Sequence, residues 1–470
     1  MAAAGGGGSL AAFKAGPKLA PDADLGAAAK ERGIEFFLVA FVDVKGVLRS
    51  KMVPAPAIGQ IQKDGAGFAP FAAWLDFGPD ASDMVAIPDP STLIQLPFQP
   101  EIGFVIGDCY IDGKKVEDSP RWVLKGLTQK TAEEGYTFKT GVEPEFFLLA
   151  DAAVPAISDP KDQQEKPCYD AQALMRRYAV LREIVQTLNA CGFGVYQTDH
   201  EDANGQFEIN WHYTDCLTTA DQHVFFKWVT KTLAERHGFK ATFMPRPFKN
   251  LTGNGCHVHC SLWKGSTNVF QGDASAKTEG PEALQRLGLS QMGLHFMGGV
   301  LSKATVLCAL TNPTVNSYKR LVGIPTASGA TWAPNRVSWS GNNRTHMIRV
   351  PDGDRFEVRV ADGAANPYLL QAAVLSAGMW GLKQQVSPAP YFFDPTVNMY
   401  KIPDGAPELK GIPLLPQNLL DALRALEADP DARALLGAAC VESFLKLKKD
   451  EWADFIRHLT DWELQNTLDC

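Results

Sequence analysis

The segment "GNGCHVHC", residues 253–260, contains two cysteines and two histidines within five positions. Cysteine and histidine are the usual ligands of structural zinc, so a zinc site is the first interpretation to test. In a β-strand, successive side chains point to opposite faces. If this segment is a strand, Cys256 and Cys260 point to one face and His257 and His259 to the other. The cysteines are then small core residues, and the histidines form a pair on a polar face.

Two other segments alternate in the same way. "TGVEPEFFLL" places Glu143 and Glu145 on one strand face, and "RFEVRV" places Arg355, Glu357 and Arg359 on one face. Each segment alone is typical of a half-exposed strand in an antiparallel sheet. Together with the histidine pair, they predict several strands whose polar faces line one cavity.

A third acidic segment, "DHEDANGQFEINW", has an Asn-Gly pair that is typical of a tight turn between strands. Glu201 precedes this turn and Glu208 follows it, so both carboxylates can reach one location. Five carboxylates in one cavity would repel each other and become protonated unless cations were present. Two divalent ions would supply four positive charges, and oxygen ligands with one imidazole suit Mg²⁺ or Mn²⁺ better than zinc.

Several arginines stand in the same part of the sequence, namely Arg320, Arg344, Arg349, Arg355 and Arg359. Hard divalent cations combined with arginines are typical of a site that handles phosphate groups. The chain contains no GxxxxGK[ST] motif, so it is not expected to be a P-loop ATPase.

Composition excludes several other classes of protein. The 470 residues are 45% hydrophobic and 21% charged, which is ordinary for a globular protein with more than one domain. A formal net charge of -8 argues against nucleic-acid binding. The chain contains no run of about 20 uninterrupted apolar residues, so the sequence predicts no membrane span. Nine dispersed cysteines indicate a reducing compartment, and we expect a cytoplasmic protein, with organelle targeting by the N-terminal tail as the alternative.

The sequence divides into three parts that differ in local composition and in hydrophobic pattern. Residues 1–24 are an Ala/Gly-rich tail that we expect to be disordered. Residues 25–118 contain short β-like runs with turn candidates "DVKG" and "DGKK", which predict a small β-rich domain. Residues 119–470 alternate longer helical patterns with strands, so the predicted fold class is α+β.

The chain resembles glutamine synthetase over almost its whole length after the tail. The matching blocks are "GVEPEFFL", "HEDANGQFEIN", "FMPRPF", "GNGCHVHCSL", "NPTVNSYKRL", "NNRTHMIRVP" and "RFEVRVADGAANPYL". The resemblance implies a β-grasp-like N-terminal domain and a catalytic domain whose antiparallel sheet bears the metal ligands and is flanked by helices. It also implies a homo-oligomer of stacked rings, commonly a dodecamer, with each active site between neighbouring subunits.

The resemblance further implies a role for each matched residue. One metal would be held by Glu145, Glu201 and Glu208, and the second by Glu143, His257 and Glu357. The family contacts ATP at the positions of His259, Ser261, Arg344, Arg349 and Arg355. It contacts glutamate at the positions of Gly253, Arg320 and Arg359. Direct roles in catalysis would fall to Arg320, Arg359 and Glu357.

The implied reaction is ATP-dependent joining of glutamate to an amine through γ-glutamyl phosphate, with two or more Mg²⁺ or Mn²⁺ ions. Two residues that bind and deprotonate ammonium in ordinary members are absent here. Thr326 stands at the spacing of a flap glutamate, and the region containing Asp76 and Asp80 lacks the acid before the tryptophan. Thr252 also replaces an asparagine that many members have beside the substrate glycine.

These departures resemble a divergent branch that contains both bacterial type III glutamine synthetases and γ-glutamylmethylamide synthetases. Glutamine formation from ammonia is the favoured prediction because it is the commoner activity in the family. Ligation of methylamine or another small primary amine is the alternative. A ring-forming structural pseudo-enzyme is the remote alternative, since it predicts loss of the ligands and arginines that this chain retains.

Tyr400, in "VNMYKIP", stands where adenylylated bacterial members carry their modified tyrosine. The flanking residues differ from those members. An unmodified tyrosine in an exposed loop is therefore the favoured interpretation, with regulatory modification as the alternative.

Overall fold

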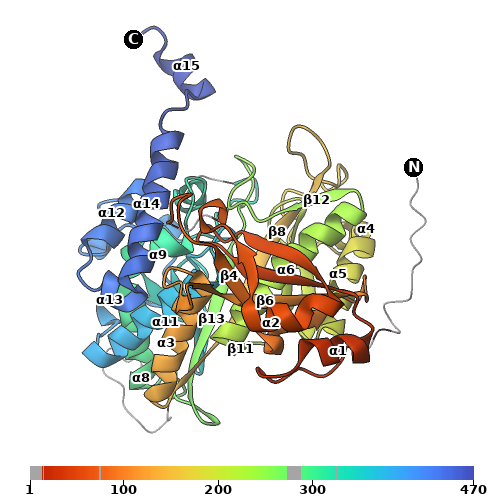
Figure 1. Cartoon of the computed structure of the whole chain (residues 1–470). Coiled ribbons are helices and arrows are strands. Elements are labelled where there is room, and N and C mark those ends of the chain that lie inside the picture. The colour runs from red at the N-terminus through yellow and green to blue at the C-terminus, as the bar shows by residue number, and fades with distance from the viewer. Residues whose placement is uncertain (1–12, 14, 74–75, 273–286, 324–325) are drawn as a thin grey trace.

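Residues 13, 15–73, 76–272, 287–323 and 326–470 are described by a computed structural model (Figure 1). The tail that we expect to be disordered lies mostly outside these residues, at positions 1–12 and 14. Helix α1, Leu25–Arg32, begins directly after it. The Asp24 carboxylate accepts hydrogen bonds from the backbone N–H groups of Gly26 and Ala27 at 2.7 and 3.1 Å. Asp24 therefore caps the helix and marks the end of the tail.

The first sheet has seven strands in the order β2-β1-β6-β4-β3, with β5 and β7 also paired to β6. Its strands are β1 Phe36–Val42, β2 Leu48–Pro54, β3 Ala66–Phe68, β4 Met84–Pro88, β5 Ile94–Gln95, β6 Ile102–Ile111 and β7 Lys114–Lys115. The two predicted hairpin turns join β1 to β2 and β6 to β7. Strand β3, which follows the first hairpin and α2, pairs with β4.

The second sheet has ten strands in the order β15-β16-β17-β13-β8-β10-β9, with β11 and β12 paired to β8 and β14 to β13. Its strands are β8 Thr137–Ala150, β9 Val195–His200, β10 Gln206–Trp211, β11 Thr214–Asp215, β12 Phe239–Thr242, β13 Cys256–Lys264, β14 Thr267–Asn268, β15 Trp339–Ser340, β16 Ile348–Asp352 and β17 Arg355–Val358. The pairs along this sheet are antiparallel except β15 with β16. The predicted α+β class with a largely antiparallel second sheet is confirmed.

Helices flank the second sheet and form the C-terminal part of the chain. The α-helices after α1 are α2 Ile58–Asp64, α3 Pro120–Glu133, α4 Ala171–Arg176, α5 Tyr178–Ala190, α6 Cys216–Arg236, α8 Gln291–Ser302, α9 Ala304–Thr311, α10 Ser317–Leu321, α11 Pro367–Gln384, α12 Leu419–Ala428, α13 Ala432–Leu436, α14 Ala438–Phe455 and α15 Asp461–Thr467. Short 3₁₀ turns are η2 Ala55–Ala57, η3 Pro70–Ala73, η4 Pro90–Thr92, η5 Ala389–Tyr391, η6 Met399–Lys401 and η7 Pro407–Leu409. Figure 1 shows α15 projecting away from the rest of the protein, beyond the end of α14.

Arg121 connects the first sheet with helix α6. The predicted domain boundary at residues 118–119 falls between β7 and α3, and Arg121 lies in the first turn of α3. Its guanidinium is buried and lies 3.0 Å from Asp89, 2.6 Å from Asp108 of β6 and 3.1 Å from Asp221 of α6. One cation thus neutralises carboxylates from both parts of the chain, which is the arrangement that makes a buried charge tolerable.

Helices α8 and α11 cross at close range in the core. A Cβ on Gly299 would lie only 2.1 Å from the Ala377 carbonyl oxygen, and one on Gly381 would lie 2.3 Å from the Gly299 Cα. Glycine therefore lets the two backbones touch. Most side chains of α11 are buried. Among the described residues no single helix is long and apolar enough to cross a membrane; α8 and α9 meet that test only as a pair, bent by 73°.

We expect Gly299→Ala to destabilise the protein, because the added methyl group would push α8 away from α11. Overpacking of this kind typically costs about 1–3 kcal/mol. Gly126→Ala is the matched control, since Gly126 also lies in a helix, α3, and a Cβ there meets no atom within 4 Å. Its melting temperature should stay equal or rise slightly. Equal melting temperatures for Gly299→Ala and the unaltered protein would contradict the close helix crossing.

Candidate active site

Strand register brings the predicted acidic and histidine residues together. Within the second sheet, β8 lies between β10 and β13, and β17 lies on the far side of β13. Glu145 of β8 is paired with Glu208 of β10, and Glu143 of β8 with His257 of β13. His259 of β13 is paired with a residue of β17, Glu357. The predicted alternation is confirmed, because Cys256 and Cys260 on the other face of β13 are buried in the apolar core.

Three groups of side chains have ligand atoms that all lie within 4.8 Å of one another among the described residues. The first is Glu145, Glu201 and Glu208, the same set that the resemblance implies for one metal. The other two are Glu143, Glu208 and His257, and Glu143, His259 and Glu357.

The set expected for the second metal is therefore divided between two groups that share Glu143. His257 Nδ1 still lies 3.7 Å from Glu143 Oε2 and 3.5 Å from Glu357 Oε1. The difference arises because both histidines of β13 face the same acids, and His259 Nε2 lies 3.0 Å from Glu143 Oε1.

Hydrogen bonds hold the first group in place. Glu145 Oε2 accepts from the Gly255 backbone N–H at 2.7 Å and from Gln206 Nε2 at 2.9 Å. Glu208 Oε1 accepts from Asn210 Nδ2 at 3.0 Å. Neutral donors fix these carboxylates without cancelling their charge.

The charge within the cavity is divided unequally. Burial raises the pKa of Glu145 to about 7. Burial and the neighbouring carboxylates raise the pKa of Glu201 and of Glu208 well above the usual range. Glu357 behaves in the opposite way: burial raises its pKa, but the guanidinium of Arg359 and other nearby cationic groups outweigh this and lower it to about 2.

The donor set fits divalent metal ions. Burial and the charge of Arg359 lower the pKa of His257 to about 4, so its imidazole is neutral, as a ligand must be. Its Nε2 is buried among carboxylates and has no hydrogen bond partner in the described part of the chain. An unpaired buried nitrogen beside several carboxylate oxygens is a suitable ligand for a hard or borderline cation.

The predicted arginines fall into two groups. Arg349 Nε and Arg359 Nη1 each lie 2.5 Å from a Glu357 oxygen, and Arg320 is buried with Nη1 donating to the Val360 carbonyl at 2.9 Å. Arg344 lines the same cavity as these three. Arg355 lies apart from them, with 38% of its side chain exposed and Asp352 at 2.7 Å.

Two cavities meet at Glu143. The acidic cavity, of about 440 Å³, contains the six predicted metal ligands together with Gly253, Arg320, Arg344, Arg349 and Arg359. The second, which we call the aromatic cavity, has about 340 Å³ and is lined by the predicted ATP-contact residues His259, Ser261 and Arg355. The residues assigned to ATP are thus divided between both cavities. Gly253 has a physical requirement for glycine, since a Cβ would lie 2.2 Å from the Pro245 carbonyl oxygen.

Sequence patterns did not indicate the aromatic walls of the second cavity. Tyr213 and Trp263 are stacked with ring centroids 6.5 Å apart, and Lys139 Nζ lies 4.0 Å from the Trp263 ring centroid. All three line the aromatic cavity. Stacked rings with an adjacent cation suit a flat heterocycle that carries phosphates.

Sequence reasoning also missed Asp199, which lines the acidic cavity. Its Oδ1 is buried and has no hydrogen bond partner in the described residues, and burial with the nearby charge of Glu143 raises its pKa to about 6. The strand pattern gave only a weak signal, since Asp199 pairs with Glu208 across β9 and β10. An unpaired carboxylate in this position is available to a substrate.

Of the positions that differ from ordinary members, Thr252 lines the acidic cavity. Thr252 Oγ1 donates to Asp202 Oδ2 at 2.5 Å, and Ser328 Oγ donates to the same oxygen. Thr326 Oγ1 bonds to the Ala330 carbonyl and does not line the cavity. Asp76 forms an ion pair with Lys446 of α14. Asp202 therefore lines the acidic cavity and also contacts Ser328, two residues after Thr326.

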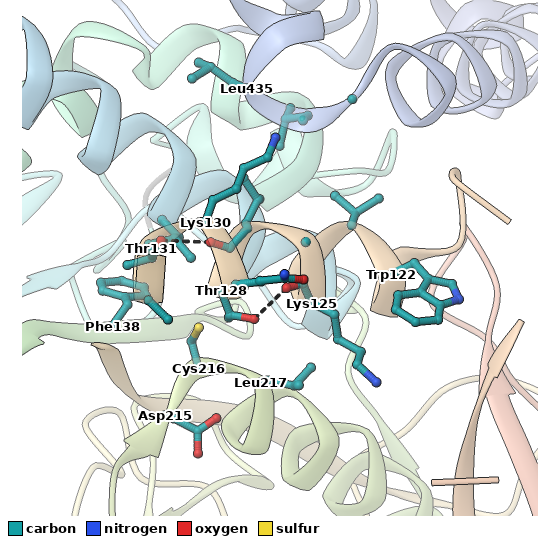
Figure 2. A pocket seen from close by; sticks show the side chains of 18 of the residues that line it. Trp122, Lys125, Thr128, Lys130, Thr131, Phe138, Asp215, Cys216, Leu217 and Leu435 are labelled. Atoms are coloured by element: carbon teal, nitrogen blue, oxygen red, sulfur yellow. Dashed lines mark hydrogen bonds between the residues drawn. The ribbon is translucent and has the colours of Figure 1, made fainter. Parts of the chain in front are cut away.

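A larger cavity than these two lies elsewhere. It has about 840 Å³ and lies between α3, the start of α6 and α13. Figure 2 shows α3 crossing it, with Leu435 on one side and Cys216 and Leu217 on the other. None of the predicted site residues lines this cavity, so its size does not mark the site of the chemistry.

Comparison with known proteins supports the resemblance to glutamine synthetase that the sequence motifs indicate. Residues 117–467 match the family model "Glutamine synthetase, catalytic domain". A glutamine synthetase of Rhizobium leguminosarum bv. phaseoli is 51% identical over 449 residues, covering 95% of this chain and 99% of that protein. A glutamate–methylamine ligase of Methyloversatilis universalis is 42% identical over 443 residues, covering 94% and 97%.

A solved structure of a GmaS/ADP complex in its conformation 1 is also similar. It is 50% identical, covers 95% of this chain and 100% of that chain, and superimposes with a TM-score of 0.87. By sequence motifs, by fold and by relatives that span almost the whole chain, this protein belongs to the glutamine synthetase family.

Proposed function

We propose that this protein is an ATP-dependent glutamate–amine ligase that acts through γ-glutamyl phosphate and forms glutamine from glutamate and ammonia. The observation that carries the proposal is the pair of cavities that meet at Glu143, one acidic with buried arginines and one aromatic with a lysine. Such a pair accommodates a nucleotide on one side and an anionic acceptor on the other. The retained ligands and arginines argue against a pseudo-enzyme.

The aromatic cavity would bind ATP. The adenine ring would lie against Tyr213 and Trp263, with His259, Ser261 and Arg355 around the nucleotide. Its phosphates would then extend past Glu143 into the acidic cavity, where Arg344 and Arg349 lie.

Divalent metal ions would bind in the acidic cavity. Glu145, Glu201 and Glu208 would hold one ion, and Glu143, His257 and Glu357 would hold the second. When bound, Mg²⁺ or Mn²⁺ supplies the positive charge that stabilises the transferring phosphoryl group. The assignment of Glu357 to the second set follows the family resemblance and its 3.5 Å approach to His257.

Arginines would orient the acceptor. Arg320 and Arg359, with Gly253 beside them, would bind glutamate and its phosphorylated form. A γ-carboxylate oxygen attacks the terminal phosphorus of ATP, the bond to ADP breaks, and γ-glutamyl phosphate forms. Glu357 contributes by fixing Arg349 and Arg359, each 2.5 Å away. Because water would hydrolyse the acyl phosphate, burial of these groups is part of the chemistry.

Asp199 would accept a proton from the amine. The amine nitrogen attacks the acyl carbon, the bond to phosphate breaks, and the nitrogen must lose a proton. Asp199 Oδ1 is a buried carboxylate oxygen of this cavity that has no hydrogen bond partner in the described residues, and Asp199 is paired with Glu208 across β9 and β10. Asp202 is less suited to this step, since Thr252 and Ser328 already donate to it.

Methylamine is the second candidate for the amine. The relatives named glutamate–methylamine ligase and GmaS are 42% and 50% identical to this chain. The two missing acids also favour it, because Thr326 stands at the spacing of the flap glutamate and the region of Asp76 and Asp80 lacks the acid before the tryptophan.

We infer a homo-oligomer, with stacked rings and active sites between subunits as the family arrangement. The projecting C-terminal arm, residues 456–470, supports this, because Leu459, Trp462 and Leu468 are 76%, 66% and 76% exposed. Large exposed apolar side chains that lie close together are typical of interaction surfaces. The cysteines, which form no disulfide in the described residues, support the cytoplasmic location expected from the sequence.

Phosphate release with glutamate, ATP and Mg²⁺ tests the choice of amine. Saturation curves for ammonium and methylammonium should give the higher kcat/KM for ammonium. If methylammonium is preferred by tenfold or more, about 1.4 kcal/mol of transition-state preference, the second candidate function is correct. No phosphate release with either amine would contradict both.

Asp199→Asn should block the amine step and leave phosphoryl transfer intact. Loss of a general base typically lowers the rate by about 100-fold or more. We therefore expect amide formation to fall by that amount, while glutamate-dependent ADP formation without amine stays within threefold of the unaltered enzyme. Asp151→Asn, on an exposed turn, is the control. Equal loss of both rates would mean that Asp199 acts earlier than the amine step.

Replacing Leu459, Trp462 and Leu468 with serine should reduce the size of the assembly. The substitutions remove apolar surface from the C-terminal arm and leave the folded body unchanged. Light scattering during size-exclusion chromatography should show a smaller molar mass than for the unaltered protein. Asn466→Ser, in the same arm, is the control. An unchanged molar mass for the triple variant would show that the arm does not hold subunits together.

A further inference from the structure

The turn between β9 and β10, residues 201–205, carries one predicted metal ligand and leads to another. Glu208 lies within β10 and pairs with Glu145 of β8, so strand register holds it. Glu201 follows β9 directly, and its N–H donates to the Gln206 carbonyl at 2.9 Å, which extends the pairing by one residue. The backbone of Glu201 is therefore held on one side by the sheet and on the other by the turn.

Asp162 contacts this turn at three points. It lies in the segment between β8 and α4, and its side chain is buried. Its Oδ2 accepts from the Gly205 backbone N–H at 2.7 Å and lies 2.7 Å from His200 Nε2. Its Oδ1 accepts from Asn204 Nδ2 at 3.0 Å. One carboxylate thus joins the residue before Glu201 to the two residues that end the turn.

The imidazole of His200 carries this contact on to Glu201. Its Nδ1 lies 2.8 Å from the Glu201 carbonyl oxygen, while its Nε2 faces Asp162. The ring is buried, so it cannot rotate without leaving a buried polar atom unpaired. Asp162 and His200 together therefore fix the backbone from which the Glu201 side chain reaches the acidic cavity.

The segment that bears Asp162 is itself anchored. Asp159 accepts from the Lys161 backbone N–H at 3.1 Å and forms an ion pair with Arg176 of α4 at 2.5 Å. The turn packs closely against this segment, because Gly205 has a φ of 75° and a Cβ there would lie 3.0 Å from Ile157 Cβ. The carboxylate that holds the turn thus projects from a fixed part of the chain.

We propose that Asp162 is a positioning residue for the metal ion that Glu145, Glu201 and Glu208 would hold. The inference rests on the proposed function, which assigns these three carboxylates to a divalent ion. Asp162 does not line the acidic cavity, so it acts through the turn that carries Glu201. Groups that orient metal ligands in this way typically contribute about 10- to 100-fold to metal affinity.

Asp162→Asn tests the proposal, with binding of Mn²⁺ to the full-length protein without substrates as the readout. Both Asp162 oxygens accept hydrogen bonds, so an amide places an NH₂ group against a donor of the turn. A titration followed by electron paramagnetic resonance of free Mn²⁺ should show one site weakened about tenfold or more and the other unchanged. Glu201→Gln identifies that site, since it alters the ligand itself and should weaken the same binding step.

Asp159→Asn is the matched control. Asp159 is a buried acid of the same segment, and its side chain bonds to Lys161 and Arg176, which lie outside the turn. This variant should lower the melting temperature but leave both Mn²⁺ affinities unchanged. If Asp162→Asn does not fold, Asn204→Ser decides the question, because it removes the donor to Asp162 Oδ1 and keeps the carboxylate. It should weaken the same Mn²⁺ site by a smaller factor.

Unchanged Mn²⁺ binding in Asp162→Asn, or in Asn204→Ser where that variant is the one that folds, would overturn the proposal. Equal weakening in Asp162→Asn and Asp159→Asn would also overturn it, since a general loss of stability would then explain the change. An unaltered protein that binds no Mn²⁺ would contradict the proposed function and this inference with it. That failure is seen without any variant, so the two failures are distinguishable.

Discussion

Repulsion between buried carboxylates is the constraint on which the site depends. Strands β8, β10 and β17 bring four glutamates onto one face, and a fifth, Glu201, follows β9 directly. The protein neutralises only part of their charge. Arg349 and Arg359 compensate Glu357, whereas Glu145 receives only neutral donors and Glu208 a single amide. Glu357 therefore holds the two arginines in position, and the remaining carboxylates favour the binding of cations. This division explains how one sheet can both bind metal and orient an anionic substrate.

The face can hold this charge because the layer behind it is rigid. Cys256, Val258 and Cys260 of β13 are buried on the opposite face, in a core that also contains α8 and α11. The glycines that let α8 and α11 touch leave little room for either helix to shift. Catalytic side chains need support of this kind, since a displacement of about 1 Å can remove much of the rate advantage. The close helix crossing is therefore part of the functional architecture as well as of stability.

Period-two alternation predicted the faces of β8, β13 and β17, because a one-residue shift would bury every charge. The Asn-Gly turn likewise predicted that Glu201 and Glu208 converge. Alternation along a strand could not separate the two cavities or identify Asp199. The position of Asp199 in the cavity depends on the pairing of β9 with β10, which alternation does not predict. Trp462 shows a further limit: its helical spacing suggests a packing anchor, yet it is 66% exposed. Periodicity identifies an apolar face but not whether that face packs within its own chain.

The two ends of the acidic cavity are built differently, which has consequences for substrate choice. The predicted metal ligands lie on strands or, for Glu201, directly after one, where register fixes their position, whereas Arg320 lies in helix α10. Other parts of the lining come from segments between strands, including Tyr169 and Trp332, which both have positive φ. Non-glycine residues in that conformation persist only where the surrounding structure holds them, and they are common at functional sites. Relatives named glutamine synthetase and glutamate–methylamine ligase are 51% and 42% identical to this chain, so proteins of one family are named for different amine substrates.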